Sequence, residues 1–145
     1  MHDVVIKIIN TSGNNLPDYA TNGSAGMDIR ASLQTPVILQ PLERAMIPTG
    51  LYFEIPQGYE GQMRPRSGLA MKHGITCLNS PGTIDSDYRG ELKVILINLS
   101  NQEQIISNGE RIAQVVISKV EQALLHPVEQ LQDSLRGEGG WTYRN

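Results

Sequence analysis

Two carboxylates on one tight turn are the clearest candidates for chemistry in this sequence of 145 residues. Asp85 and Asp87 lie in NSPGTIDSDYRGEL (79–92), just after a Pro-Gly turn, and are followed at once by Tyr88 and Arg89. Asp, Ser and Gly are ordinary turn residues, so a surface turn alone would account for the pair. A carboxylate can also act as a general base towards water. Which of these applies depends on what the other side chains of the protein offer.

Two further polar clusters are embedded in apolar surroundings. AGMDIRA (25–31) places Asp28 between two apolar residues, where an acid is either a turn or bulge residue or a ligand for metal-bound water. RPRSGLA (64–70) supplies the planar donors of Arg66, the hydroxyl of Ser67 and the unhindered amide of Gly68. Those are the parts of a phosphate site without a Walker loop. The alternative for this cluster is a plain helix cap beside two solvated arginines.

Two more clusters lie towards the C-terminus. GERIAQVVI (109–117) places Arg111 and Gln114 at the entrance of a strand, where by themselves they indicate an exposed strand end. RGEGGW (136–141) combines Arg136, glycines and Trp141, and such an arm could fold over a nucleotide, with the arginine on phosphate and the indole on the base. Stacking of that kind is worth about 1–3 kcal/mol. The alternative for this cluster is a disordered tail.

The common catalytic motifs are absent. There is no Walker loop and no G-x-S-x-G elbow, and His2, His73 and His126 form no zinc-ligand spacing with one another or with Cys77. A side-chain nucleophile therefore has no candidate. Cys77 lies in the apolar run GITCL, which predicts a buried structural thiol.

Short β-branched runs with period-2 patterns dominate the elements that must position these clusters. Strands are predicted at 4–10, 36–40, 45–56, 91–99 and 111–120, with turn-rich segments between them. This pattern predicts an all-β fold: a sandwich, a jelly roll or a partly closed barrel. One short helix is expected in SGLAMKHG (67–74), with Ser67 as its N-cap and Gly74 at its end. Near the C-terminus, Val128, Leu131 and Leu135 fit either a helical stripe or an extended strand followed by a tail.

Length and composition set broad limits. The chain fits one domain, predicted to span 1–136, with a mobile arm over 137–145. A net charge of −3 gives no general attraction for nucleic acid, so we expect no nucleic-acid partner. The sequence starts without a signal-peptide pattern, and no apolar run reaches the roughly 20 residues of a membrane span, so we expect a cytoplasmic protein without a membrane partner.

Taken in order, the five clusters resemble the five motifs of the trimeric deoxyuridine triphosphatases (dUTPases). The similarity runs from about Ala25 to Trp141 without a large insertion. The resemblance implies a distorted jelly roll assembled as a homotrimer, with active sites shared between subunits and Mg²⁺ as cofactor. It also implies hydrolysis of dUTP to dUMP and pyrophosphate, which limits uracil incorporation into DNA and supplies dUMP for thymidylate synthesis.

The resemblance further implies a role for each residue. Asp85 would be the general base for water that attacks the α-phosphorus, Ser67 would lie near the leaving oxygen, and Gln114 would contact phosphate or orient the water. Asp28 would hold Mg²⁺ through its water shell, Asp87 would satisfy the amides of the turn, and Arg111 would fix either the sheet or a nearby acid. The substrate-binding residues would be Arg66, Ser67, Gly68, Asn79, Gly82, Thr83, Ile84, Tyr88, Gln114, Arg136 and Trp141. The hairpin 79–88 would read uracil, and Tyr88 would leave no space for a 2′-hydroxyl.

The fifth motif departs from the family pattern. Trp141 stands where the family usually has phenylalanine, and TYRN (142–145) replaces the usual glycine and hydroxyl residues. The principal alternative is therefore a dUTP-binding regulatory protein with the same fold and impaired catalysis. A deoxycytidine triphosphate deaminase and a purely structural jelly roll are the other two. The presence of Asp85, Ser67 and Gln114 together favours the enzyme.

Overall fold

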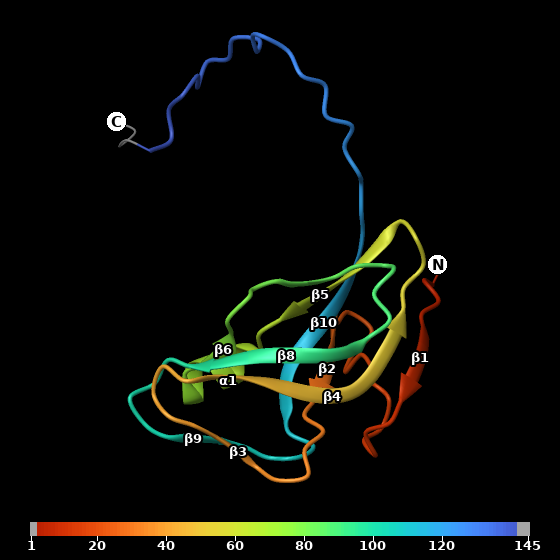
Figure 1. Cartoon of the computed structure of the whole chain (residues 1–145), viewed down its shortest axis with the longest axis vertical. Coiled ribbons are helices and arrows are strands. Elements are labelled where there is room, and N and C mark those ends of the chain that lie inside the picture. The colour runs from red at the N-terminus through yellow and green to blue at the C-terminus, as the bar shows by residue number, and fades with distance from the viewer. Residues whose placement is uncertain (1–2, 142–145) are drawn as a thin grey trace.

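A computed structural model describes residues 3–141 and contains ten β-strands and one short helix (Figure 1). The strands are β1 (Lys7–Asn10), β2 (Gly26–Arg30), β3 (Val37–Leu39), β4 (Arg44–Glu54), β5 (Tyr59–Arg64), β6 (Ile75–Cys77), β7 (Gly82–Ile84), β8 (Glu91–Asn98), β9 (Gln104–Ile106) and β10 (Arg111–Lys119), and the helix is α1 (Ser67–His73). Within these described residues, no helix has the length and apolar character needed to cross a membrane.

Two four-stranded antiparallel sheets form the body of the protein. One has the order β1-β4-β8-β6 and the other β2-β10-β5-β7, while β3 and β9 form a separate two-stranded ribbon. Buried and more exposed residues alternate along β8, so that Leu92, Val94 and Leu96 point into the core. Ile29 of β2 and Val115 of β10 are buried within the same core. The predicted all-β jelly roll with one short helix is confirmed.

The second sheet positions the first four of the five polar clusters. Its strands β2 and β10 contain the clusters around Asp28 and Gln114, β5 leads into the cluster around Arg66, and β7 belongs to the hairpin that precedes Asp85. Because antiparallel pairing places these strands side by side, segments up to about ninety residues apart in sequence meet on one sheet.

A buried amide ties two loops to the first sheet. Asn98 is fully buried at the end of β8 and donates through Nδ2 to the carbonyl oxygens of Leu39 (2.9 Å) and Gln102 (2.7 Å). Its Oδ1 accepts hydrogen bonds from the amide and the hydroxyl of Ser100. Asn98 thus satisfies polar groups that the core could not otherwise hold.

Helix α1 starts one residue earlier than predicted. The Ala70 amide donates to the Arg66 carbonyl oxygen at 3.0 Å, so Arg66 is the N-cap and Ser67 already lies within the helix. The prediction of Ser67 as N-cap is therefore wrong, and no side chain caps this end. The exposed Ser67 hydroxyl is not used as a cap and can serve a ligand. Gly74 ends the helix in the left-handed region with φ of 65°, as predicted.

The chain beyond β10 leaves the body of the protein as a C-terminal segment, residues 121–141, which is called the arm below and begins earlier than the predicted arm of 137–145. From residue 121 to residue 141 every side chain is exposed, and no helix or strand forms (Figure 1). Neither interpretation of the segment around Val128 and Leu131, a helical stripe or a strand, is therefore correct for the single chain. The division into 1–136 and 137–145 stays a prediction, and both His2 and TYRN (142–145) lie outside the described residues.

Candidate active site

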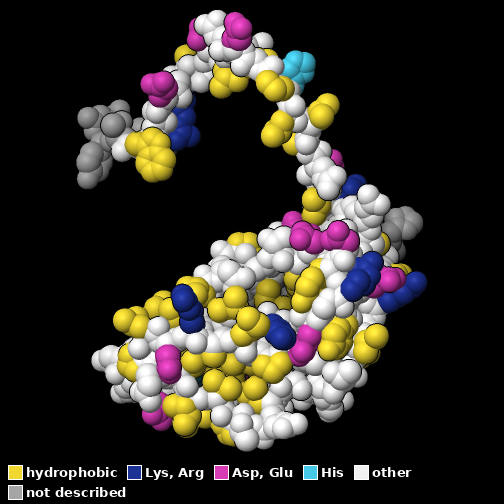
Figure 2. Space-filling view, in the orientation of Figure 1, with side chains coloured by type: hydrophobic (Ala, Val, Ile, Leu, Met, Phe, Trp, Pro, Cys, Tyr) yellow, Lys and Arg dark blue, Asp and Glu magenta, His cyan; other side chains and the backbone are white. Residues whose placement is uncertain are grey.

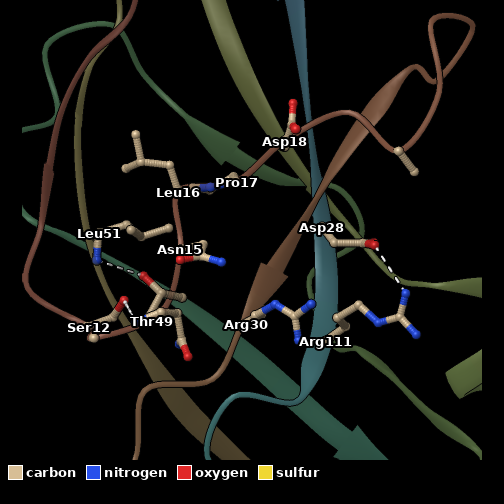
Figure 3. Close-up of a pocket in the computed structure, with 13 residues that line it drawn as sticks. Ser12, Asn15, Leu16, Pro17, Asp18, Asp28, Arg30, Thr49, Leu51 and Arg111 are labelled. Atoms are coloured by element: carbon tan, nitrogen blue, oxygen red, sulfur yellow. Dashed lines mark hydrogen bonds and ion pairs between the residues drawn. The ribbon is translucent and has the colours of Figure 1, made fainter.

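Residues from three of the five clusters meet in one network of ion pairs. Arg66 Nε lies 3.0 Å from Asp28 Oδ1, and Arg111 Nη1 lies 3.7 Å from Asp28 Oδ2. Figure 3 shows Asp28 on β2 facing Arg111 on the neighbouring β10. Of the two roles expected for Arg111, the contact is consistent with fixing a nearby acid, which is Asp28. Arg66 was expected on phosphate, and in the structure it contacts this carboxylate.

Gln114 extends the network across the sheet. It lies opposite Asp28 on β2 and opposite Arg64 on β5. Its Nε2 donates to the Pro65 carbonyl oxygen at 3.0 Å, directly before Arg66. Gly26 makes room for it, since a Cβ on Gly26 would lie 2.4 Å from Gln114 Oε1. The predicted site residues of the first, second and fourth clusters, which are Asp28, Arg66 and Gln114, therefore lie together in one polar patch, called the phosphate patch below.

The turn-forming hairpin lies next to this patch. Its strand β7 pairs with β5, so that Thr83 faces Gln62 and Gly82 faces Met63. A cavity of about 370 Å³ opens between the hairpin and the phosphate patch. Its lining consists of Gln62, Arg64, Pro65, Pro81 and Gln114.

Arg64 was not among the predicted site residues. It is exposed, donates to Gln62 Oε1 through Nε at 3.0 Å, and lines this cavity. The sequence could have indicated Arg64, because it follows the buried Met63 at the end of a strand. Alternation along the strand then places its side chain on the outer face of the sheet.

Within the hairpin, the backbone is held firmly and the polar side chains are free. Gly82 and Ile84 are buried, and a Cβ on Gly82 would lie 3.1 Å from Asn79 Nδ2. Thr83 and Asp85 are exposed. This arrangement leaves backbone groups near Asn79 available to read a planar ligand and leaves the Asp85 carboxylate accessible to water.

The turn after β7 is closed by backbone and arginine contacts. The Tyr88 amide donates to the Asp85 carbonyl oxygen at 3.2 Å, and Arg89 Nη1 donates to the Ser86 carbonyl oxygen at 2.7 Å. These hydrogen bonds, and none from the Asp87 side chain, pair polar backbone groups of the turn. The role expected for Asp87 is corrected accordingly.

Tyr88 is positioned by a close fit to its neighbours. Its hydroxyl donates to the Glu91 carbonyl oxygen at 2.8 Å, and 45% of the residue is exposed. A Cβ on Gly90 would lie 2.4 Å from this hydroxyl oxygen and 2.7 Å from ring atom Cζ. Only glycine at position 90 therefore lets the ring adopt this position.

The fifth cluster is not brought to the site by its own chain. Arg136 Nε donates to the Gly139 carbonyl oxygen within the arm, and Trp141 is fully exposed. Figure 1 shows the arm leading away from the sheets. A site that uses Arg136 and Trp141 must therefore be completed by an arm in a different position or from a different chain.

Asp28 also lies at the edge of a polar cavity of about 620 Å³ (Figure 3). The cavity is lined by the loop 12–18, Ala20, Thr49 and Leu51, and by the charged residues Asp28, Arg30 and Arg111. Among the described residues no three His, Cys, Asp or Glu side chains form a metal-binding group. Mg²⁺ usually keeps several waters and binds one or two carboxylates together with substrate phosphates. A single, partly exposed Asp28 carboxylate fits that mode.

Cys77 takes no part in the patch. It is a buried free thiol in β6, and burial raises its pKa to about 11, so the predicted structural role is consistent with its chemistry.

Fold and site together define a class: an antiparallel jelly roll in which carboxylate, arginine and amide side chains from distant segments meet in one patch. A family model described as dUTPase matches residues 13–143. The chain therefore belongs to the dUTPase family. This confirms the predicted family and the predicted enzyme class, dUTP diphosphatase.

Relatives and solved structures agree over nearly the whole chain. A deoxyuridine 5′-triphosphate nucleotidohydrolase of Cytophaga hutchinsonii is 59% identical, over 94% of this chain and 88% of the relative. The protein of the same name from Fusobacterium nucleatum is 56% identical over 97% of both chains. A dUTPase of Staphylococcus bacteriophage 80alpha, solved with dUpNHpp, superimposes with a TM-score of 0.85 at 27% identity, over 94% of this chain and 96% of the other.

Proposed function

We propose that the protein hydrolyses dUTP to dUMP and pyrophosphate, with Asp85 as the general base. The observation that supports this most is the union of Asp28, Arg66 and Gln114 in one patch beside the hairpin that carries Asp85. This patch supplies cations and amides for a triphosphate, and the hairpin supplies an accessible carboxylate and a backbone edge for a base.

In the proposed reaction, water held by Asp85 attacks the α-phosphorus. The new bond joins the water oxygen to phosphorus, the bond to the bridging α–β oxygen breaks, and the water proton passes to Asp85. Ser67, exposed at the start of α1, would donate to the departing oxygen. The Arg66 guanidinium and the Gly68 amide would stabilise the charge that shifts onto pyrophosphate.

Asp28 is the residue that would hold Mg²⁺ through a water molecule. When bound, the metal neutralises charge on the triphosphate, which a protein with a net charge of −3 cannot do by its overall field. Gln114, fixed by its bond to the Pro65 carbonyl, would contact phosphate or orient the attacking water.

The hairpin would select the base and the sugar. The backbone of 82–84 and the Asn79 amide would pair with uracil, and cytosine would leave buried donors unpaired at about 1–3 kcal/mol each. The Tyr88 ring, fixed by the Glu91 carbonyl, would lie against the deoxyribose and exclude a 2′-hydroxyl.

The proposed assembly is a homotrimer with shared sites. Leu124 and Leu125 on the arm are 94% and 85% exposed, and Figure 2 shows hydrophobic side chains along the arm's length. An apolar groove of about 520 Å³ on the body matches them. It is lined by Asp3, Val4, Ile6, Ile8, Leu16, Pro17, Tyr19, Met27, Phe53 and Ile117. An arm from a second copy in this groove would bury both surfaces and carry Arg136 and Trp141 towards another copy's site.

The biological role follows from the proposed products. Removing dUTP limits uracil incorporation into DNA, and dUMP is the substrate for thymidylate synthesis. We place the reaction in the cytoplasm, a proposal with which the single free thiol of Cys77 is consistent.

The test is pyrophosphate release from dUTP, dTTP, dCTP and UTP with Mg²⁺, by the wild type and by Asp85→Asn. We expect release from dUTP alone and its loss in the variant. If the wild type binds dUTP and releases nothing, the protein is a regulatory binder and the enzymatic proposal is wrong.

Shared sites have a separate test. Asp85→Asn and Arg136→Ala are each expected to be inactive or weakened as homotrimers. Mixed trimers should regain activity, because some sites would then combine an intact hairpin with an intact arm. No recovery after subunit exchange, with exchange verified by mass, would show that each site is built from one chain.

A further inference from the structure

The Asp28 carboxylate is held by two arginines, one on each oxygen. Arg66 Nε contacts Oδ1 at 3.0 Å and Arg111 Nη1 approaches Oδ2 at 3.7 Å. The side chains of Arg66, Asp28 and Arg111 are 25%, 34% and 51% exposed, so the innermost pair is the one between Arg66 and Asp28. Arg66 Nη1 also reaches the Arg111 carbonyl oxygen at 3.5 Å.

This network competes with the bound state that the proposed function requires. There, Arg66 would donate to phosphate and Asp28 would hold Mg²⁺ through a water molecule. The contact between Arg66 Nε and Asp28 Oδ1 uses the Nε donor, which a side-on, bidentate grip on phosphate through Nε and one Nη would also need. Arg66 must therefore leave Asp28 for this grip to form.

We propose that Arg111 is a positioning residue, which holds Asp28 in place while Arg66 transfers from Asp28 to the triphosphate. The proposal rests on the proposed function. Arg111 approaches Oδ2, the oxygen that Arg66 does not use, so this contact can persist when Arg66 leaves. Without Arg111, the departure of Arg66 before a metal binds would leave the Asp28 carboxylate without either of its two arginine partners.

The backbone supports this role for Arg111. The register between β10 and β2 shifts between Arg111 and Ala113, where two residues of β10 advance against one of β2. A bulge of this kind re-aims a side chain, and they are frequent beside active sites. The Arg111 side chain is directed towards Asp28, two positions along β2 from its register partner Arg30 (Figure 3).

The exchange makes triphosphate binding and metal binding cooperative. Asp28 would release Arg66 for phosphate when it holds a metal through water, and Arg66 would release Asp28 for the metal when it binds phosphate. By linkage, each ligand must strengthen the other by the same factor. Arg111 acts on this coupling only through Asp28, and that distinguishes it from a residue that contacts phosphate itself.

The experiment is a titration of the full-length protein with the non-hydrolysable analogue dUpNHpp, with and without Mg²⁺. Without Mg²⁺, we expect Arg111→Ala to weaken the binding of dUpNHpp by about two- to fivefold, the range of a partly exposed ion pair. With Mg²⁺, we expect the variant to need a higher metal concentration to reach half of the gain in dUpNHpp affinity that saturating Mg²⁺ produces. Arg111→Lys should keep most of the metal-free affinity and a nearly unchanged Mg²⁺ requirement, because it keeps the charge. Arg30→Ala is the matched control, since Arg30 lies on β2 and donates to the Gly109 carbonyl rather than to Asp28.

Two double variants decide how Arg111 and Asp28 act. Asp28→Asn should tighten metal-free binding by about two- to fivefold, because Arg66 is then free, and should do so only while Arg66 is present. Arg111→Ala should have no effect once Asp28 is Asn. If Arg111→Ala weakens binding equally in that background, or if Asp28→Asn tightens binding equally in Arg66→Ala, the proposal is wrong.

The failure of the proposed function would look different. In that case the wild type would release no pyrophosphate from dUTP, whether or not it binds dUpNHpp. If the wild type binds dUpNHpp and hydrolyses dUTP, but the two double variants show that Arg111, Asp28 and Arg66 act independently, only the role of Arg111 is refuted. Thermal unfolding of each variant identifies any that lose affinity through a loss of folding.

Discussion

Gly90→Ala should weaken discrimination against UTP without removing any side chain that contacts substrate. A Cβ at position 90 would lie 2.4 Å from the Tyr88 hydroxyl oxygen, where ordinary contact begins at 3.4 Å, so the ring must move by about 1 Å. The movement breaks the hydrogen bond from Tyr88 to the Glu91 carbonyl, which is worth about 0.5–1.5 kcal/mol. The backbone at position 90 tolerates alanine, because it is not in the left-handed region.

The size of the effect is limited by what a steric pocket can achieve. A pocket that merely excludes an added hydroxyl discriminates by about a hundredfold. We therefore expect the ratio of kcat/KM for dUTP to that for UTP to fall by about tenfold or more in Gly90→Ala. Part of the fall should come from lower dUTP turnover and part from increased UTP turnover.

Steady-state pyrophosphate release from dUTP and from UTP gives kcat/KM for each substrate. The ratio of the two values is then compared between the wild type and Gly90→Ala. Gly23→Ala is the matched control, since Gly23 lies in an exposed turn and a Cβ there meets no atom within 4 Å. An unchanged dUTP-to-UTP ratio in Gly90→Ala, with the variant folded, would refute the assignment of Tyr88 as the sugar-excluding residue.

Three further predictions follow from single contacts. Gly26→Ala should displace Gln114 from the Pro65 carbonyl and lower kcat/KM for dUTP by about tenfold or more, with little change in the denaturation midpoint; an unchanged kcat/KM would contradict this. Cys77 should stay largely protonated and slow to react with a thiol reagent below about pH 11 in the folded protein, and should react once denaturant is added; rapid labelling of the native state at neutral pH would contradict the burial. Asn98→Ala should lower the free energy of unfolding by about 1–3 kcal/mol, because it leaves the buried Leu39 carbonyl unpaired; urea denaturation with an unchanged midpoint would show otherwise.

Strands with a clear local pattern could be predicted. β1, β3, β4, β8 and β10 lie within or overlap the predicted ranges, because they carry β-branched or alternating apolar residues. Strands β6, β7 and β9 have three residues each and were missed, as was β2, whose sequence GMDIR shows no β-branched run. β5 lies outside the predicted strand ranges and contains Gly61. A Cβ on Gly61 would lie 3.1 Å from the Ile84 side chain of the neighbouring strand β7, a close contact between strands that no local pattern reveals.

The candidate site was predicted as a set of residues but not as an arrangement. Residue types placed Arg66 in a candidate phosphate site and made Asp28 a possible ligand for metal-bound water, while the role of Gln114 towards phosphate or water came from the resemblance to the dUTPases. Their contacts depend on the register of β10 against β2 and β5, which no single segment specifies. The pairing of Arg66 with Asp28 could therefore be seen only in the fold. The arm is the opposite case, because its apolar residues near Val128 suggested structure that the single chain does not form.

The position of bond cleavage tests the proposed mechanism most directly. Hydrolysis of dUTP in water enriched in ¹⁸O, analysed by mass spectrometry, should place the label in dUMP and none in pyrophosphate, and Asp85→Asn should abolish that labelling. Label in pyrophosphate or in free phosphate would show attack at another phosphorus. That result would contradict the account of Asp85 as the base for water at the α-phosphorus.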